Sequence, residues 1–324
     1  MKTLILSGLG ANCEKETAHS CRKAGAPRDS VNVIHINELY FGDLELADYH
    51  FLILIGGFLD GDDLGGARAC ANRFRYRPLP SGGTFLERLE DFVSQGRLVR
   101  GICTGFQLLS RLGLLFRDYA VEQPASEQPA AGQPAAGQPA AGQPAAGQPA
   151  AGLHRSGQPE EGQRGSGNDG GRVTLTTNAN GRFEDRWVRL RGDGASPCVF
   201  TRGIERIELP VRHGEGRMVG EHPGVLSRLV ESKLVPLRYC LPDGTPTEEY
   251  PGNPNGSPFG IASLCNPQGT VMGLMPHPEA FNHYTNHPRW TRRPPGGQDG
   301  ETGEDGDGLL LFRNAYAHLR GMGG

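Results

Sequence analysis

Short apolar runs in the first hundred residues place the strongest constraint on the fold. They are TLILS (3–7), VNVIHI (31–36), FLILIGG (51–57) and LVRGI (98–102), and each stops at glycine or a polar turn. Runs that are apolar at nearly every position, rather than at alternate ones, are typical of parallel strands covered on both faces. Helix-like segments at 14–26 and 84–96 separate these runs. The pattern predicts an α/β fold with a doubly wound, mainly parallel sheet and helices on both faces.

The second half of the chain is richer in strand-like pieces. They are RVTLTT (172–177), DRWVRLR (185–191), KLVPLRY (233–239), GIASLCN (260–266) and TVMGLMP (270–276). The last apolar segment, 307–321, has the period of an amphipathic helix. We therefore expect a single domain over 1–324 in which a β-rich excursion precedes a closing helix.

Two polar stretches interrupt this pattern. Residues 122–171 contain consecutive QPAAG repeats, and residues 292–308 are rich in glycine, proline and acidic side chains. Neither has enough large apolar side chains to offset the entropy lost on ordering. We predict that both are disordered insertions, which a loop tolerates because closure entropy grows slowly with length.

Charge and cysteine content exclude several classes of protein. The net charge is −3, and no apolar run approaches the ~20 residues of a membrane span, so we expect neither a nucleic acid nor a membrane as partner. The 7 cysteines are odd in number and scattered without a CxxC pair, which is neither a disulfide framework nor a zinc-ribbon spacing. This usage favours the cytoplasm.

One of these cysteines lies in GICTGFQLL (101–109), between the strand-like run 98–102 and a helical segment. The pattern G-x-C-x-G at that junction has the layout of a nucleophile elbow. Gly101 and Gly105 would permit close backbone packing, and the start of the helix would stabilise a thiolate on Cys103. The N–H of Thr104 would face a developing oxyanion. The same residues are equally compatible with a small buried cysteine at a glycine-rich turn.

A candidate base for Cys103 lies in LMPHPEAF (274–281). Pro276 and Pro278 favour an extended backbone, in which residues i and i+2 share a face. His277 and Glu279 would then point to the same side, and the carboxylate would orient the imidazole. Taken alone, this segment fits a surface loop at least as well.

The same region allows a metal hypothesis. His277, His283 and His287 have H-x5-H-x3-H spacing, and two histidines four residues apart on a helix can hold zinc. Pro278 and Pro288 interrupt such a helix, and no carboxylate or cysteine completes the set cleanly. We therefore predict no metal site.

Taken together, these motifs resemble class I (triad) glutamine amidotransferases, and within them the glutaminase subunits of phosphoribosylformylglycinamidine synthase. The resemblance covers nearly the whole chain outside the two insertions. The matching stretches are GLGANC (8–13), GGF (56–58), GICTGFQLL (101–109), GRFEDRWV (181–188), HGEG (213–216), YPGNPNGSPFGIASLCNPQGTVMGLMPHPEAF (250–281) and GLLLFRNA (308–315).

The resemblance implies a role for each site residue. It makes Cys103 the nucleophile and His277 with Glu279 the rest of the triad. The other implied roles are an oxyanion hole from backbone N–H groups of Gly56, Gly57 and Thr104, glutamine binding by Gln107 and the HGEG loop with His213, and a partner-facing position for Phe183 and Arg186. His213 could instead be a structural loop residue, and Phe183 and Arg186 could simply pack.

The chain departs from the family pattern at several positions. Thr104 stands where asparagine is usual, GGFLDGD (56–62) stands where a GGFSYGD-like stretch is usual, and Ala280 replaces a common arginine. Since an oxyanion hole needs only the backbone N–H of Thr104, we expect activity to survive the first change.

The implied function is hydrolysis of glutamine to supply ammonia to a separate ATP-dependent synthetase subunit. That subunit would convert formylglycinamide ribonucleotide to phosphoribosylformylglycinamidine in purine biosynthesis, and a small third subunit would join the complex. This chain would need no cofactor, with ATP and Mg²⁺ on the synthetase; no G-x4-G-K-[ST] phosphate loop is present. Alternatives are an amidotransferase for another acceptor, a stand-alone hydrolase of glutamyl amides, and a non-catalytic scaffold.

The repeat insertion provides a first test. If it is a passive loop, deletion of residues 123–171 leaves glutamine-dependent activity of the complex largely unchanged. The deletion would shorten a loop, which changes the closure entropy only slightly, and would remove no contact on which the folded domain depends. Steady-state rates of the deleted and full-length chains measure this, and a large loss of activity would give the repeats a role in the reaction.

Overall fold

The computed structural model describes residues 1–42, 44–62, 64–116, 173–292 and 304–322. The predicted insertion at 122–171 lies outside the described residues, as does most of the stretch 292–308. At the described end of the latter, Asp305 forms an ion pair with Lys23 at 2.6 Å. None of the helices in the described ranges is both long enough and apolar enough to cross a membrane.

A six-stranded sheet forms the centre of the molecule, in the order β10-β11-β4-β3-β1-β2. Its strands are β1 (Thr3–Ser7), β2 (Val31–His35), β3 (Phe51–Leu54), β4 (Leu98–Ile102), β10 (Ser263–Cys265) and β11 (Val271–Leu274). All neighbours are parallel except β10, which runs antiparallel to β11 at one edge. The mainly parallel sheet predicted from the apolar runs is confirmed.

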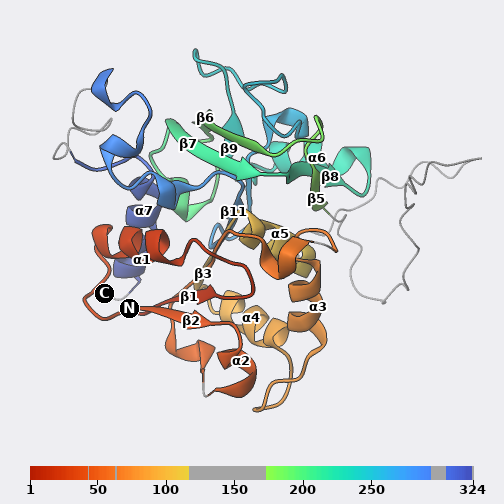
Figure 1. Cartoon of the computed structure of the whole chain (residues 1–324), viewed down its shortest axis with the longest axis vertical. Coiled ribbons are helices and arrows are strands. Elements are labelled where there is room, and N and C mark those ends of the chain that lie inside the picture. Colours follow the sequence, from red (N-terminus) through yellow and green to blue (C-terminus); the bar gives the residue numbers. More distant parts are fainter. Residues whose placement is uncertain (43, 63, 117–172, 293–303, 323–324) are drawn as a thin grey trace, which may run out of the picture.

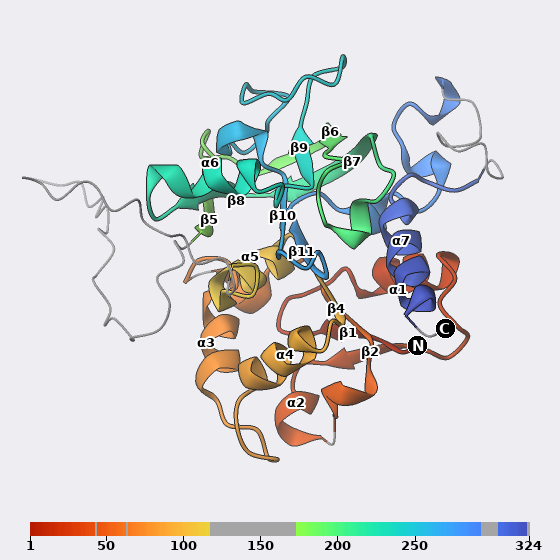
Figure 2. The same cartoon turned by 180° about the vertical axis from the view of Figure 1, so that it is seen from behind.

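Helices cover both faces of this sheet (Figures 1 and 2). On one face lie α1 (Glu14–Lys23) and α7 (Leu309–Gly321), and on the other α3 (Arg68–Tyr76), α4 (Phe85–Ser94) and α5 (Thr104–Leu112). The start of α4 is defined by a capping box between Thr84 and Glu87. The short α2 (Glu38–Phe41) follows the edge strand β2, and α3 was not predicted from the sequence.

A β-rich part lies beyond the carboxyl edge of the main sheet (Figure 1). It contains β5 (Val173–Thr177), β6 (Glu184–Gly192), β7 (Arg206–His213), β8 (Glu215–Gly220), α6 (Pro223–Glu231) and β9 (Leu237–Tyr239). The strands form a β5-β8 pair and a β7-β6-β9 sheet. The predicted excursion is present, but β7 and β8 were missed; Pro210 inside β7 weakens its strand signal.

Single turns of 3₁₀ helix connect many of these elements. They lie at Leu46–Asp48, Leu59–Asp62, Val199–Thr201, Pro258–Gly260, Pro278–Ala280, Tyr284–Asn286 and Trp290–Arg292.

The core contains a fully buried cation, Arg100, on the central strand β4. Its guanidinium lies 3.7 Å from the ring centroid of Phe312, with Phe51 and Phe200 also within 6 Å. None of its three guanidinium nitrogens has a hydrogen-bond partner among the described residues. Burial lowers the pKa of Arg100 to about 10. Aromatic faces therefore provide the direct contacts of this charge.

The packing of α5 on the sheet predicts the effect of one substitution. A Cβ added to Gly105 would lie 1.9 Å from the carbonyl oxygen of Leu54 in β3, which cannot move without disturbing the sheet. We expect Gly105→Ala to lower the free energy of unfolding by about 3 kcal/mol, as overpacked cores do. Chemical denaturation measures this.

The matched control is Gly194→Ala. Nothing lies within 4 Å of a Cβ at Gly194, so the free energy of unfolding should stay within about 0.5 kcal/mol of the parent protein. Equal stability of the two variants would contradict the close approach of α5 to β3.

Candidate active site

Cys103 lies between β4 and α5 in a strained turn. Its φ of 52° and ψ of −110° belong to a region that non-glycine residues rarely adopt, so the surrounding packing must hold it there. The flanking glycines permit that packing, since a Cβ on Gly101 would lie 2.4 Å from the carbonyl oxygen of Gly105. The elbow conformation predicted from G-x-C-x-G is present, at the carboxyl edge of the sheet.

His277 and Glu279 follow β11 at the same edge. Nδ1 of His277 lies 2.6 Å from Oε1 of Glu279, and the side chains are 3% and 1% exposed. The prediction of an extended backbone is wrong for part of this segment. Pro278–Ala280 forms a turn of 3₁₀ helix, whose first position suits the fixed φ of proline. The predicted pairing is present, and the N–H of His277 is anchored on the carbonyl of Pro210 in β7 at 2.8 Å.

Gly56 brings the thiol and the imidazole together. A Cβ at Gly56 would lie 2.8 Å from Cε1 of His277 and 3.3 Å from Cβ of Cys103, so both side chains flank this residue. Any larger side chain would displace one of them. The Cys103 thiol also lies 3.7 Å from the carbonyl oxygen of Arg212 at the end of β7.

The buried His277–Glu279 pair is electrostatically coupled. Burial disfavours a charged imidazole, but the Glu279 carboxylate and the Cys103 thiol outweigh it and hold the pKa of His277 well above its usual 6.5. Burial likewise opposes ionisation of Glu279, yet His277 lowers the pKa of that carboxyl. Nε2 of His277 is buried and makes no regular hydrogen bond to a described residue. The arrangement favours an imidazolium facing the thiol.

Gly57 and Thr104 lie where an oxyanion hole would be needed. Both line the same cavity as Cys103, and the N–H of neither donates to a backbone acceptor among the described residues. The hydroxyl of Thr104 donates to the carbonyl of Gly57 and so fixes the two peptides relative to each other. This use of the Thr104 side chain was not predicted. Gly56 has a different part in the site. Its missing side chain leaves room for His277 and Cys103, and its carbonyl accepts the N–H of Asn12 at 3.1 Å.

The cavity beside Cys103 has a volume of about 180 Å³. Gln107 and His213 both line it, as the resemblance implied. Nε2 of Gln107 donates to the carbonyl of Glu215 at 2.8 Å, whereas its Oε1 is buried without a partner among the described residues. This oxygen lies toward Gly66, where an added Cβ would be 2.2 Å from it.

His213 presents a second unused acceptor. The amide of Asn178 donates to backbone carbonyls, so its Oδ1 accepts from Nδ1 of His213 at 3.1 Å and leaves Nε2 without a proton. Burial and the charge of His277 lower the pKa of His213 to about 3, which keeps the ring neutral. Nε2 is a buried acceptor that has no partner among the described residues.

Sequence reasoning gave no individual role to Cys13, which follows β1, or to Phe58, which follows β3, although both line the cavity. Phe58 stacks on Phe183 with ring centroids 6.2 Å apart, and both rings are more than half exposed. The rule that ligands bind beyond the carboxyl ends of parallel strands could have identified Cys13 and Phe58. Glu215, in the HGEG loop to which the resemblance assigns glutamine binding, also lines the cavity from the start of β8.

The H-x5-H-x3-H spacing does not produce a shared site. Nε2 of His287 lies 2.8 Å from Oε2 of Glu208, and Nδ1 of His283 lies 2.7 Å from Oγ1 of Thr285. Each histidine of the pattern therefore has its own partner.

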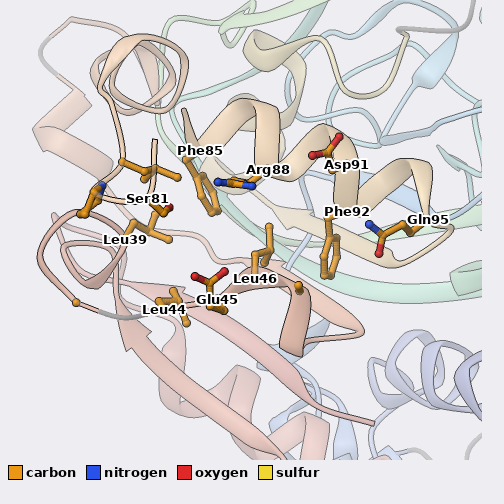
Figure 3. A pocket seen from close by; sticks show the side chains of 14 residues that line it. Leu39, Leu44, Glu45, Leu46, Ser81, Phe85, Arg88, Asp91, Phe92 and Gln95 are labelled. Atoms are coloured by element: carbon orange, nitrogen blue, oxygen red, sulfur yellow. The ribbon is translucent and has the colours of Figure 1, made fainter. Parts of the chain in front are cut away.

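A larger cavity lies near the amino ends of β3 and β4 (Figure 3). Its volume is about 480 Å³, and it is lined by Leu46 beside Phe85, Arg88 and Phe92 of α4. None of the site residues predicted from the sequence lines it. Cys103, His277 and Gln107 line the smaller cavity instead, so cavity volume alone does not point to the predicted site residues.

The coupling of His277 to Glu279 predicts a pH effect. In Glu279→Gln the carboxylate that raises the pKa of His277 is gone, so the ring should titrate at a pH lower by about one unit or more. Because the folded pKa exceeds the unfolded value, the pair stabilises the fold fully below the unfolded pKa and less as pH rises through the folded pKa. Proton NMR of ¹³C-histidine-labelled protein measures the midpoint.

The matched control is Glu208→Gln, which neutralises the carboxylate of the His287 pair instead. The His277 midpoint should then be unchanged. Equal midpoints in Glu279→Gln and the parent protein would contradict the coupling.

Comparison with known proteins identifies the family. Residues 1–138 and 162–319 match the CobB/CobQ-like glutamine amidotransferase domain. The chain is 36% identical to phosphoribosylformylglycinamidine synthase subunit PurQ of Methanococcus maripaludis, over 89% of this chain and 85% of that protein. It is 35% identical to the PurQ subunit of Dehalococcoides mccartyi, over 99% and 98% of the two chains.

A solved structure supports the fold. The chain superposes on one from the structure of PurLQS from Thermotoga maritima with a TM-score of 0.59 and 22% identity, covering 98% of each. The family match spans both the Cys103 and the His277 segments. The chain therefore belongs to the family of glutamine amidotransferases that includes the PurQ subunits of phosphoribosylformylglycinamidine synthase.

Proposed function

We propose that this chain hydrolyses the side-chain amide of glutamine through Cys103, His277 and Glu279. The ammonia would pass to an ATP-dependent synthetase subunit that forms phosphoribosylformylglycinamidine. The observation that carries this proposal is the strained Cys103 elbow beside a buried histidine–carboxylate pair, in one cavity with two unused backbone N–H groups. The PurQ relatives support this destination for the ammonia, because they are named as subunits of phosphoribosylformylglycinamidine synthase.

In the first half of the reaction the Cys103 thiolate attacks the amide carbon. The N–H groups of Gly57 and Thr104 donate to the oxyanion of the tetrahedral intermediate. When the carbon–nitrogen bond breaks, Nε2 of His277 gives its proton to the leaving nitrogen, so ammonia departs and a thioester remains on Cys103. Glu279 holds the other ring nitrogen and stabilises the imidazolium before that transfer.

In the second half water replaces ammonia. His277, now neutral, takes a proton from the water that attacks the thioester carbon. Collapse of this second intermediate releases glutamate and restores the thiolate and imidazolium. Gln107 and His213 line the cavity, and their buried, unpaired acceptors Oε1 and Nε2 would have to turn toward the N–H donors of a glutamine substrate to bind it.

The synthetase subunit would dock over the open side of this cavity. Phe58 and Phe183 expose a stacked aromatic pair there, and exposed aromatic rings are typical of interface anchors. Arg186 stacks on Tyr250 at 4.7 Å on the neighbouring surface. ATP and Mg²⁺ would bind the synthetase, and a small third subunit would complete the assembly in the cytoplasm.

Cys103→Ala in the reconstituted complex tests the proposal. We expect glutamine-dependent synthesis to fall by a factor on the order of 10⁴, since loss of the nucleophile removes the covalent route. Synthesis from ammonium salt should persist, because the synthetase site is intact. Rates with each nitrogen source measure this.

Cys240→Ala is the matched control, because Cys240 is also buried but does not line the cavity. It should retain both activities. Equal glutamine use by Cys103→Ala and the parent chain would contradict the assignment of the nucleophile. Loss of both activities in Cys103→Ala would contradict the division of labour between the subunits.

A further inference from the structure

A second thiol lies beside the imidazole of His277. Cys13 is the residue before α1 and lines the same cavity as Cys103 and His277. Its Sγ, a ring nitrogen of His277 and a carboxylate oxygen of Glu279 all lie within 4.8 Å of one another. Within the described ranges this is the one cluster of three such side chains whose ligand atoms come so close. The glutaminase reaction proposed above has no use for Cys13.

The histidine of this cluster is oriented as metal-binding histidines usually are. Nδ1 of His277 is engaged by Oε1 of Glu279 at 2.6 Å, which directs the opposite nitrogen, Nε2, toward the thiols. Nε2 is buried without a regular partner among the described residues. A carboxylate on the far nitrogen fixes the tautomer and raises the basicity of a ligating imidazole.

We propose that this cluster binds Zn²⁺ through Sγ of Cys13, Sγ of Cys103 and Nε2 of His277, as a reversible inhibitory ion. Two thiolates and an imidazole are a typical ligand set for zinc, which would keep water in its fourth position. Thiolate ligands select zinc over Mg²⁺. Sγ of Cys103 lies in the same cavity but outside the three-residue cluster, and Sγ of Cys13 makes a weak hydrogen bond to Oδ1 of Asn12 at 3.7 Å. Rotation of the two cysteine side chains therefore has to close the set when the ion binds. Inhibition rests on the proposed function, because the ion occupies the nucleophile.

Proton release accompanies binding. Burial raises the pKa of the Cys13 thiol, so its proton stays on at neutral pH until a metal displaces it. Nε2 of His277 must also lose its proton to become a ligand, because only the neutral ring can bind a metal. Zinc binding therefore releases protons, and the affinity rises with pH.

Zinc chloride titrated into the full chain tests the site directly. The chain is kept reduced with a phosphine, and a chromophoric chelator competes for the metal. We expect one ion per chain at this site, and Cys13→Ser should weaken binding by roughly tenfold or more, as loss of even an indirect partner does. Cys240→Ser is the control and should bind as the parent does. Equal affinity of Cys13→Ser and the parent would overturn the proposal.

Cobalt substitution gives a readout that needs no variant. Co²⁺ in this site should show a thiolate-to-cobalt charge-transfer band that zinc removes, because both ions use the same ligands. Absence of the band at saturating Co²⁺ would overturn the site, whether or not Cys13→Ser folds.

Activity distinguishes this inference from the function on which it rests. In the complex, zinc should inhibit glutamine-dependent synthesis and spare ammonium-dependent synthesis, with each variant compared to its own metal-free rate. If glutamine-dependent synthesis requires Cys103 but is not inhibited by zinc, the zinc site is overturned and the proposed function stands. Zinc binding that depends on Cys13 in a chain without glutaminase activity would support the site and overturn the proposed function.

Discussion

The strained turn at Cys103 is the constraint on which the rest of the site depends. A non-glycine residue holds this conformation only where close packing determines it, and here Gly101 and Gly105 let β4, β3 and α5 approach within contact distance of backbone atoms. The turn directs the thiol beyond the sheet edge and places the first N–H of α5 beside it. The remaining site residues are arranged around that fixed point.

Electrostatics provides the second level of organisation. His277 and Glu279 are both buried, and such a pair is tolerable only because each partner compensates the desolvation of the other. Arg100, enclosed by aromatic rings in the core, also interacts with Glu279, and after His277 it helps to lower the pKa of that carboxyl. The charge of the pair therefore depends on the central strand as well as on the His277 segment.

The β-rich part completes a cavity that the main sheet alone leaves open. It contributes His213, Glu215 and the carbonyl of Arg212 to the surroundings of Cys103. Phe183 from the same part meets Phe58 from the main sheet across the open side. The cavity is thus formed between two structural layers, and a docking partner could alter it by moving either one.

Sequence by itself predicted the sheet and the candidate reacting groups. Continuous apolar runs indicated buried parallel strands, and the glycines around Cys103 indicated the elbow, because both signals arise from local steric and solvation effects. The proximity of His277 to Glu279 followed from their spacing, although the backbone forms a 3₁₀ turn where an extended strand was expected. Only the tertiary structure decided that Cys13 lies beside His277, that the Thr104 hydroxyl holds Gly57, and that His213 and Gln107 line the cavity and carry buried acceptors without a partner among the described residues. These contacts join residues far apart in the chain, whose distance is set by the packing of whole strands and helices and not by any local pattern.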